Sequence, residues 1–290
     1  MEKCLDSLTK QQVKQDDFEV IVVDNNSSDS TAEAVAAFGQ RLPNLKYVVE
    51  QNQGLSHARN RGYAEAKGEY LVYLDDDVVA PPEYLTNILA VICQHAPDIM
   101  GGPVYPFYTT PKPRWFKDEF EIRCYAEASG FSTTCSVSGG NYIIRREVLQ
   151  ALGPFDPEYG MRGNSIGMLE EYKMLRLYRQ RTETEKQRVY YSLEAKVFHH
   201  VPPNKMNLKY MCQRRWVTGE AWYRLEFQNL PWQHLIRTLV RALYSLIRGT
   251  RHRIWRYGLF SLTPLILLCR DVFYYLGFIS GYFKTKRLAG

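Results

Sequence analysis

The chain has 290 residues, enough for one large domain or for one domain with an appendage. Hydrophobic residues make up 45% and charged residues 23%, which excludes a chain too polar to bury a sizeable core. The net charge of +6 is unevenly divided, because the first 200 residues hold 22 Lys and Arg against 28 Asp and Glu, whereas the last 90 hold 15 against 3. A basic C-terminal part suits either nucleic acid or an anionic membrane surface.

Strand and helix signals alternate over the first hundred residues. Phe18 to Val23 is a short, β-branched apolar run, typical of a buried parallel strand, and it ends in a polar turn that begins at Asp24. The order that follows is helix, strand, helix and strand, over residues 30–38, 45–50, 55–66 and 69–74. This order predicts βαβ units in an α/β fold. Ligands of such sheets bind beyond the carboxyl ends of the strands, where the turns at Asp24 and Asp75 both lie.

Three adjacent aspartates, Asp75, Asp76 and Asp77, follow the third predicted strand. Like charges this close repel one another or shift their pKa values. A hard divalent cation, Mg²⁺ or Mn²⁺, relieves the repulsion, and the diphosphate of a nucleotide supplies further oxygen ligands. Bound there, the metal would neutralise charge on a departing nucleoside diphosphate. The alternative is a solvated acidic turn or helix cap, which the preceding strand and the neighbouring Asp24 turn disfavour.

The middle of the chain is richer in loops. Residues 103–135 contain four prolines before position 114, and a Gly-Gly pair at 139–140 introduces a short apolar strand and then a helix. Residues 157–168 hold one proline and three glycines, so we predict a mobile loop there. A further helix is predicted over residues 170–181.

Five segments carry a resemblance to one enzyme family. Asp24 to Thr31 resembles the VDxxSxDxT turn of inverting glycosyltransferases of family 2, and Asn52 to Gly62 resembles that family's NxGxxxARNxG helix. Glu69 to Asp77 resembles its GEYLxFLDDD strand, and Gly139 to Asp156 resembles its GxNxxxRRxxxxxxGxFD segment. Val197 to Pro202 resembles the VxHxVP strand of a bacterial, membrane-associated branch. The segments follow the family's order over about residues 1–220, which makes the combination specific.

The resemblance implies a GT-A fold, a Rossmann-like doubly wound and mostly parallel sheet, with Mn²⁺ or Mg²⁺ as cofactor. The residues that it assigns to the nucleotide-sugar donor are Asp24, Asn26, Arg59, Asp75 and Asp76. It assigns the metal to Asp77 and Asp75, with His200 as a candidate ligand or second-sphere residue, and the acceptor to Gly139, Gly140 and Asn141. Structural alternatives remain open: Arg59 as a helix-surface arginine, the glycine pair as an ordinary turn, and His200 as a packed strand residue.

Inverting transfer needs a base that takes the proton of the acceptor hydroxyl. The family places a carboxylate at the start of a helix after a glycine-rich loop, and Glu170-Glu171 matches that place. Paired carboxylates push one pKa upward toward a usable value. We favour Glu171 as the catalytic base, with Glu170 beside it. The alternative is an acidic first helical turn that the helix dipole favours, and Met168-Leu169 stands where the family has glycine.

Residues 206–290 are predicted to form a basic, amphipathic helical tail after a catalytic domain over residues 1–205. Gln213 to Trp216 is one residue shorter than the QxxRW signature of processive synthases, so we expect only that Arg214 or Arg215 meets the diphosphate. Residues 258–283 are apolar except for Arg270-Asp271, and each flanking run is too short to span a bilayer. An in-plane or shallow re-entrant arrangement at a membrane surface is therefore favoured over a true span or a soluble interaction helix.

These features favour a membrane over nucleic acid as the partner of the basic tail, with a glycan or lipid-linked acceptor. The six cysteines show no metal-type spacing, and no apolar leader follows Met1, so reduced thiols and the cytoplasmic face of the cell membrane are expected, with peripheral or shallow insertion.

The family's first strand has no counterpart in this sequence. The family begins with a strand before the helix that matches residues 2–8, and in a sheet of order 3-2-1-4 this missing strand would lie between residues 18–23 and 69–74. Either the start lies upstream or the chain is an inactive copy. The predicted function is inverting sugar transfer from a nucleoside-diphosphate sugar to an acceptor hydroxyl in cell-surface polysaccharide synthesis. The alternatives are an inactive, membrane-associated binding protein and a nucleotidyltransferase.

Overall fold

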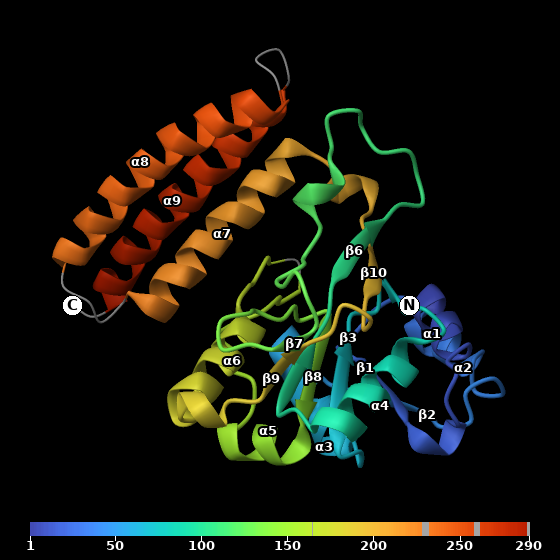
Figure 1. Cartoon of the computed structure of the whole chain (residues 1–290). Helices are drawn as coiled ribbons and strands as arrows, with labels where there is room; N and C mark the ends of the chain where they lie inside the picture. The colour runs from blue at the N-terminus through green and yellow to red at the C-terminus, as the bar shows by residue number, and fades with distance from the viewer. Residues whose placement is uncertain (164, 228–231, 258–261, 289–290) are drawn as a thin grey trace. The chain divides into compact units, whose positions relative to one another are not determined.

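The computed structural model describes residues 1–163, 165–227, 232–257 and 262–288 (Figure 1). It divides into two compact units. Unit 1 contains residues 1–109, 118–163 and 170–201, and unit 2 contains residues 110–117, 164–169 and 202–290. All six cysteines are free thiols.

Unit 1 contains every strand of the described chain, and its elements alternate as the sequence predicts over the first hundred residues. The helices are α1 (Glu2–Leu8), α2 (Thr31–Ala36), α3 (Leu55–Glu65), α4 (Tyr84–His95), α5 (Arg146–Leu152) and α6 (Glu170–Arg181). The strands are β1 (Val20–Asp24), β2 (Leu45–Val49), β3 (Tyr70–Leu74), β4 (Val78–Val79), β5 (Ile99–Gly101), β6 (Val104–Phe107), β7 (Gly130–Phe131), β8 (Asn141–Arg145), β9 (Val189–Tyr191) and β10 (Val197–His200).

The strands form three sheets. β1 and β2 pair in parallel, with Asp24 opposite Val49 at the carboxyl end. A five-stranded sheet has the order β3-β8-β5-β9-β7, and a three-stranded sheet has the order β4-β10-β6. The five-stranded sheet is mixed, because β8 runs antiparallel to both of its neighbours while β5 and β9 are parallel. Among the described residues β1 pairs with β2 alone and β3 with β8 alone, so no strand joins the two.

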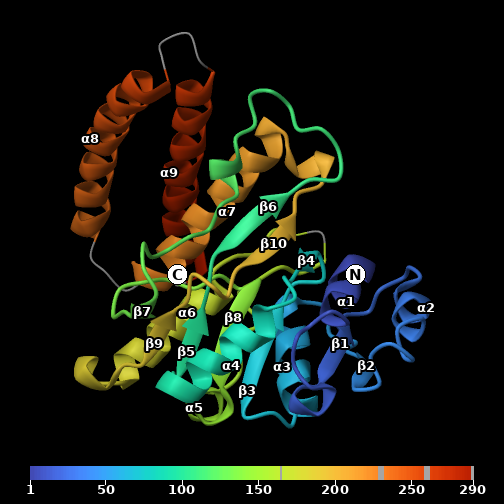
Figure 2. The same ribbon diagram turned by 45° about the vertical axis from the view of Figure 1, so that its right-hand side comes forward.

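Helices cover both faces of the five-stranded sheet (Figure 2). Alternate residues of β8 point to opposite faces, as the two-residue period of a strand requires. Tyr142 and Ile144 pack in one buried cluster with α5 and α6, and Ile143 packs in another with Tyr84 and Ile88 of α4. The sheet therefore has one hydrophobic core on each of its two faces.

Unit 2 is built from three helices, α7 (Leu208–Glu226), α8 (Trp232–Tyr257) and α9 (Thr263–Leu288), with α9 lying between the other two (Figure 1). Glycines bring α7 and α9 together: a Cβ on Gly219 would lie 2.0 Å from the carbonyl oxygen of Tyr274, and one on Gly277 would lie 2.0 Å from that of Trp216. Residues 263–286 of α9 are long and apolar enough to cross a membrane by length and composition alone.

Candidate active site

The turn after β1 holds a buried carboxylate. Asp24 is 8% exposed, its Oδ1 accepts the Ser27 amide at 2.8 Å, and its Oδ2 accepts the Tyr47 hydroxyl. Burial alone would raise the pKa of Asp24, but these hydrogen bonds outweigh it and hold the pKa below its usual value. Asn26, two residues on, has a left-handed backbone with φ of 62°. Asp24 is therefore an ionised acceptor at the end of its strand.

Asn25 is a structural residue that sequence reasoning does not single out. Its Nδ2 donates to the carbonyl oxygens of Glu50 at 3.2 Å and Asn52 at 2.7 Å, and its Oδ1 accepts the Gly54 amide at 2.6 Å. One side chain thus ties the ends of β1 and β2 to the start of α3. The polar turn of the sequence was the available signal, because asparagine commonly hydrogen-bonds nearby backbone in such turns.

Arg59 of α3 lies among carboxylates. Its side chain is 6% exposed, and Nη1 lies 2.8 Å from Glu170 Oε1 while Nη2 lies 3.8 Å from Asp75 Oδ1. Nη2 also donates to the carbonyl oxygen of Gly139 at 3.1 Å, and the guanidinium packs over the ring of Phe155. Arg59 is thus neither a helix-surface arginine nor an open cation. It joins the end of β3, the glycine pair and the first turn of α6.

The glycine pair before β8 is needed for the approach of these side chains. A Cβ on Gly139 would lie 2.7 Å from Arg59 Nη2, and one on Gly140 would lie 2.6 Å from Asp75 Oδ2. Both distances are shorter than real contacts, so a side chain at either position would have to displace the end of the Arg59 or Asp75 side chain. The sequence predicts that the pair lets an acceptor approach the backbone. The structure adds a second reason for glycine, which is the close approach of the Arg59 and Asp75 side chains.

The side chain of Asn141 is held by hydrogen bonds within unit 1. Its side chain is fully buried, Oδ1 accepts the Tyr84 hydroxyl at 2.7 Å, and Nδ2 donates to the Ala195 carbonyl at 2.7 Å. The amide therefore fixes β8 against α4 and the segment before β10. Acceptor binding by Asn141 remains a prediction.

The two glutamates at the start of α6 differ in environment. Glu170 is 7% exposed, and burial, with repulsion from Glu171, raises its pKa from 4.5 to about 7 in spite of its ion pair with Arg59. Glu171 is half-buried, and its Oε1 accepts the Gly139 amide at 3.2 Å. Glu171 is therefore the more accessible carboxylate of the pair, held in place by a backbone donor.

Glu170→Gln is expected to flatten the pH dependence of stability between pH 4.5 and 7. In this window the native state binds more protons than the unfolded state, so the free energy of unfolding of the wild type falls as pH rises. The stabilisation from Glu170 is complete below the pKa that this carboxyl has in the unfolded chain, and it is lost above the pKa that it has in the folded chain. At about 1.4 kcal/mol per pKa unit, the loss is on the order of 3 kcal/mol. Urea unfolding near pH 5 and near pH 8 measures it, and an identical pH dependence in the variant would contradict it.

A candidate metal centre lies beside this network. One ligand atom each of Asp75, Asp77 and His199 lies within 4.8 Å of the others, and Asp77 Oδ1 is 3.2 Å from His199 Nε2. Two carboxylate oxygens and an imidazole nitrogen fit Mn²⁺, and they are compatible with Mg²⁺. Asp76, between the two metal-facing aspartates, is exposed instead.

The histidine of this centre is His199, whereas the sequence predicts His200. Successive side chains of β10 point to opposite faces, and His199 is paired with Val78 next to Asp77. The ring of His200 points the other way, with Nε2 2.9 Å from Thr109 Oγ1 and the ring against Phe107. Only the His200 amide approaches the aspartates, donating to the Asp77 carbonyl at 2.9 Å.

The predicted diphosphate residues belong to unit 2. Arg214 and Arg215 lie in α7, where Arg215 Nη2 is 3.9 Å from Asp271 of α9 and the guanidinium lies 4.8 Å from the ring centre of Tyr274. Burial lowers the pKa of Arg215, and Asp271 opposes that shift. Contact of either arginine with a diphosphate remains a prediction.

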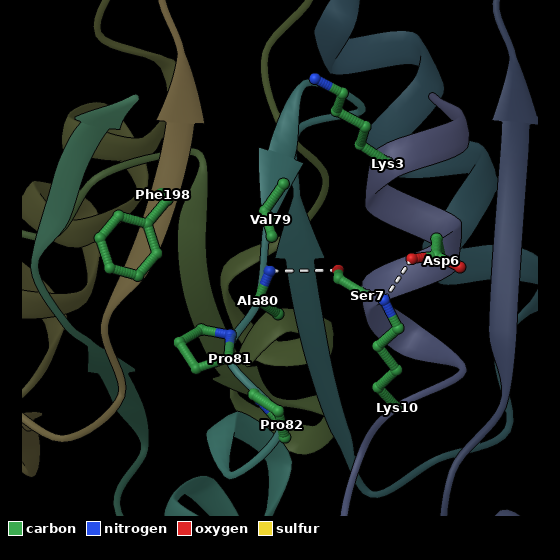
Figure 3. A pocket seen from close by; sticks show the side chains of 9 residues that line it. All are labelled: Lys3, Asp6, Ser7, Lys10, Val79, Ala80, Pro81, Pro82 and Phe198. Atoms are coloured by element: carbon green, nitrogen blue, oxygen red, sulfur yellow. Dashed lines mark hydrogen bonds and ion pairs between the residues drawn. The ribbon is translucent and has the colours of Figure 1, made fainter. Parts of the chain in front are cut away.

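A hollow of about 450 Å³ lies elsewhere in unit 1, between α1 and β4 (Figure 3). Its apolar wall is formed by Val79, Ala80, Pro81, Pro82 and Phe198. The other side is lined by Lys3, Asp6 and Ser7 of α1 and by Lys10, which follows that helix. Phe198 and His199 are successive residues of one strand and point to opposite faces. The hollow therefore lies on the other face of β10 from the candidate metal centre and contains none of its ligands.

Comparison with known proteins gives consistent matches. A family profile described as "Glycosyl transferase family 2" matches residues 1–153. The chain is 30% identical over 170 residues to glycosyltransferase AglE of Haloferax volcanii, covering 57% of this chain and 54% of that protein. It is 27% identical over 187 residues to the glucosyl-dolichyl phosphate glucuronosyltransferase of the same organism, covering 62% and 58%. The chain thus spans a little over half the length of these curated relatives.

Solved structures show the same fold at lower identity. Mannosyltransferase PcManGT from Pyrobaculum calidifontis, in complex with GDP-Man and Mn²⁺, matches with a TM-score of 0.59 at 18% identity, over 94% of this chain and 82% of that one. Residues 1–349 of S. aureus TarS, in complex with UDP, match with a TM-score of 0.54 at 18% identity, over 99% and 87%. These similarities confirm the predicted fold class.

Proposed function

Because the chain belongs to glycosyl transferase family 2, we propose that it moves a hexose from a nucleoside-diphosphate sugar to an acceptor hydroxyl, with inversion and with a divalent metal. The observation that carries the proposal is the position of Glu171. Its carboxylate is held by the Gly139 amide, and Gly139 in turn contacts Arg59, which reaches Asp75 of the candidate metal centre. These contacts join a candidate base to a candidate site for the leaving group, and an inverting displacement needs both.

Glu171 takes the proton in this mechanism. The acceptor O–H bond breaks toward the Glu171 carboxylate as the acceptor oxygen forms a bond to the anomeric carbon. The bond from that carbon to the diphosphate oxygen breaks at the same time, and the nucleoside diphosphate leaves with the electron pair. Glu170 is unsuited to this role, because it is buried and its Oε1 accepts from Arg59.

Asp75, Asp77 and His199 would hold Mn²⁺ or Mg²⁺. When bound, the metal supplies Lewis-acid neutralisation of the charge that develops on the diphosphate. The three residues are preorganised for this: Asp77 and His199 contact one another, and Asp75 is fixed from behind by Arg59. Arg59 thereby keeps a cluster of carboxylates together before any cation binds.

The donor nucleotide is proposed to lie along the edge formed by the turn after β1 and the turn after β3. Asp24, an ionised acceptor, suits an N–H group of the base, and Asn26 lies beside it. The exposed Asp76 suits the ribose hydroxyls. UDP and GDP-Man are bound by the similar structures, which supports a nucleotide-sugar donor here without choosing the base.

The acceptor is proposed to be a glycan or a lipid-linked sugar used in cell-surface polysaccharide synthesis, with the enzyme at the cytoplasmic face of the cell membrane. One relative acts on a glucosyl-dolichyl phosphate by its name. Another, 27% identical over 209 residues, is the succinoglycan biosynthesis protein ExoM of Rhizobium meliloti. The apolar α9 and the basic tail support a membrane location.

Sugar transfer is tested by incubating the purified chain with Mn²⁺ and a panel of nucleoside-diphosphate sugars. We expect one donor to release its nucleoside diphosphate slowly to water and faster with a matching acceptor. NMR of the product should show an anomeric configuration opposite to that of the donor. A product that keeps the donor's configuration would contradict the proposed single displacement, and a chain that consumes no donor would contradict the enzyme itself.

A further inference from the structure

Helix α8 of unit 2 presents an apolar stripe that unit 2 leaves exposed. The side chains of Ile236, Val240, Leu243 and Ile247 are 49%, 64%, 61% and 57% exposed. Their spacing of four, three and four residues places them in one row along the helix. A row of exposed aliphatic side chains this long is unusual on a soluble surface and indicates that a partner covers it.

A second row of α8 is basic. Arg237, Arg241 and Arg248 each follow a stripe residue by one position, so they border the stripe along its length, and all three are exposed. Residues 232–257 contain six arginines and neither Asp nor Glu. The partner must therefore offer an apolar interior directly beside a sheet of negative charge.

The contacts of α8 with α9 use a different side of the helix. Ala242 is buried, and Arg253 Nη2 forms an ion pair with Asp271 Oδ2 at 2.7 Å. Ala242 and Arg253 are not members of the stripe and lie on a different side of α8. Unit 2 thus holds α8 in place from one side while the stripe and the arginine row stay free for another surface.

Two aromatic side chains lie in the same row as the arginines. Tyr244 is 66% exposed and Trp255 is 83% exposed. Rings with an apolar body and one polar group favour the depth of lipid headgroups. Arginines bordering an apolar stripe extend their guanidinium groups to the same depth.

We infer that α8 is an in-plane docking surface for an anionic lipid leaflet, with the stripe in the acyl boundary and the arginine row among phosphate groups. The inference rests on the membrane location proposed above and names the element and the lipid class. It differs from the sequence expectation, which gives the in-plane role to residues 258–283. One side of α9 packs against α7 through glycines, and its Lys284 pairs with Glu220 of α7, whereas Leu265, Leu276 and Phe283 of α9 are exposed.

Vesicle sedimentation of the full chain tests the inference. We expect binding to vesicles that contain one-third phosphatidylglycerol in phosphatidylcholine, weakened by salt, and much weaker binding to phosphatidylcholine alone. Replacing Arg237, Arg241 and Arg248 together by Gln should weaken binding to the anionic vesicles roughly 100-fold, since each arginine near such a surface contributes about a fivefold factor. The matched control replaces Lys112, Arg114 and Lys117, three exposed cations of unit 2 outside α8, by Gln and should bind as the wild type.

Three results would overturn the inference. These are equal binding to both vesicle types, a control triple as weak as the α8 triple, and self-association without lipid that Leu243→Ser abolishes. The last result would assign the stripe to a second copy of the chain. The α8 triple should still hydrolyse donor in solution at the wild-type rate. If neither the wild type nor any variant turned over donor while the wild type still bound anionic vesicles, the proposed reaction would be wrong and this inference would stand.

Discussion

Glu171→Gln is expected to lower the rate of sugar transfer by a factor between about 10² and 10⁴, the range that general-base catalysis contributes. The amide cannot accept the proton of the acceptor hydroxyl, yet it fills the same volume and still offers an oxygen to the Gly139 amide. Nucleotide affinity should change little, because the side chain lies on the acceptor side in the proposed mechanism. Initial rates at saturating donor and acceptor, beside calorimetric titration with nucleoside diphosphate, give both quantities.

Glu170→Gln is the matched control, one residue away on the same helix turn. Its amide still accepts from Arg59, and the buried Glu170 carboxyl has no role in proton transfer in the proposed mechanism. The variant should retain most of the transfer rate. If Glu170→Gln lost far more activity than Glu171→Gln while both variants bound nucleotide normally, the base would be wrongly assigned.

Asp77→Asn is expected to remove the response of the enzyme to Mn²⁺ and to reduce transfer to near background. Loss of a residue that merely supports a ligand costs roughly 10- to 100-fold in metal affinity, so loss of a charged direct ligand should exceed about 100-fold. Asp77 is also the group that His199 contacts at 3.2 Å, so its replacement disturbs two of three ligands. Rates measured over a range of Mn²⁺ concentrations should show no saturation within the range that saturates the wild type.

The two neighbouring histidines of β10 provide the control for this metal assignment. His199→Gln should raise the Mn²⁺ concentration needed for half-maximal activity by at least about tenfold. His200→Gln should leave it unchanged, since the His200 ring lies against Thr109 and only its amide reaches Asp77. The opposite ranking would restore His200 as the ligand and contradict the observed register of β10 against β4.

The charge balance of the site explains why a cation is expected. Arg59 lies within 4 Å of both Glu170 and Asp75, and the N-terminal ammonium of Met1 lies 4.0 Å from Asp76 Oδ2. Asp77, Asp76 and Glu171 add three further negative charges nearby. Carboxylates gathered in this way raise one another's pKa or bind a metal ion. Burial is the main cause of the raised pKa of Glu170, and repulsion from Glu171 adds to it.

Elements with strong local signals could be predicted from the sequence. The run Phe18 to Val23 is apolar and β-branched and becomes β1 with a shift of two residues at its start, and residues 170–181 form α6 as predicted. Both signals are local, because a strand needs only the alternation or run of its own side chains and a helix only its own periodicity. The aspartates after β3 also lie together at the end of their strand, as the pattern requires.

The remaining features depend on contacts between distant segments. His199 and His200 cannot be told apart until the register of β10 with β4 fixes which side chain faces Asp77. The sequence assigns Arg59 to the donor and leaves a helix-surface position open, but its contact with Glu170, 111 residues later, cannot be predicted from either segment alone. The antiparallel position of β8 between β3 and β5 likewise depends on pairing between segments that are distant in the sequence. The local sequence of β8 does not predict it.

Calorimetric titration of the purified chain with UDP, GDP, ADP and dTDP, with Mn²⁺ and again with EDTA, tests the central claim most directly. The acidic cluster at the sheet edge should bind one of these nucleotides in the presence of Mn²⁺ and lose it in EDTA. Asp77→Asn should abolish that binding and Glu171→Gln should preserve it. Binding that is as tight in EDTA as in Mn²⁺, or no binding of any of the four with Mn²⁺ present, would contradict a metal-nucleotide site at Asp75 and Asp77.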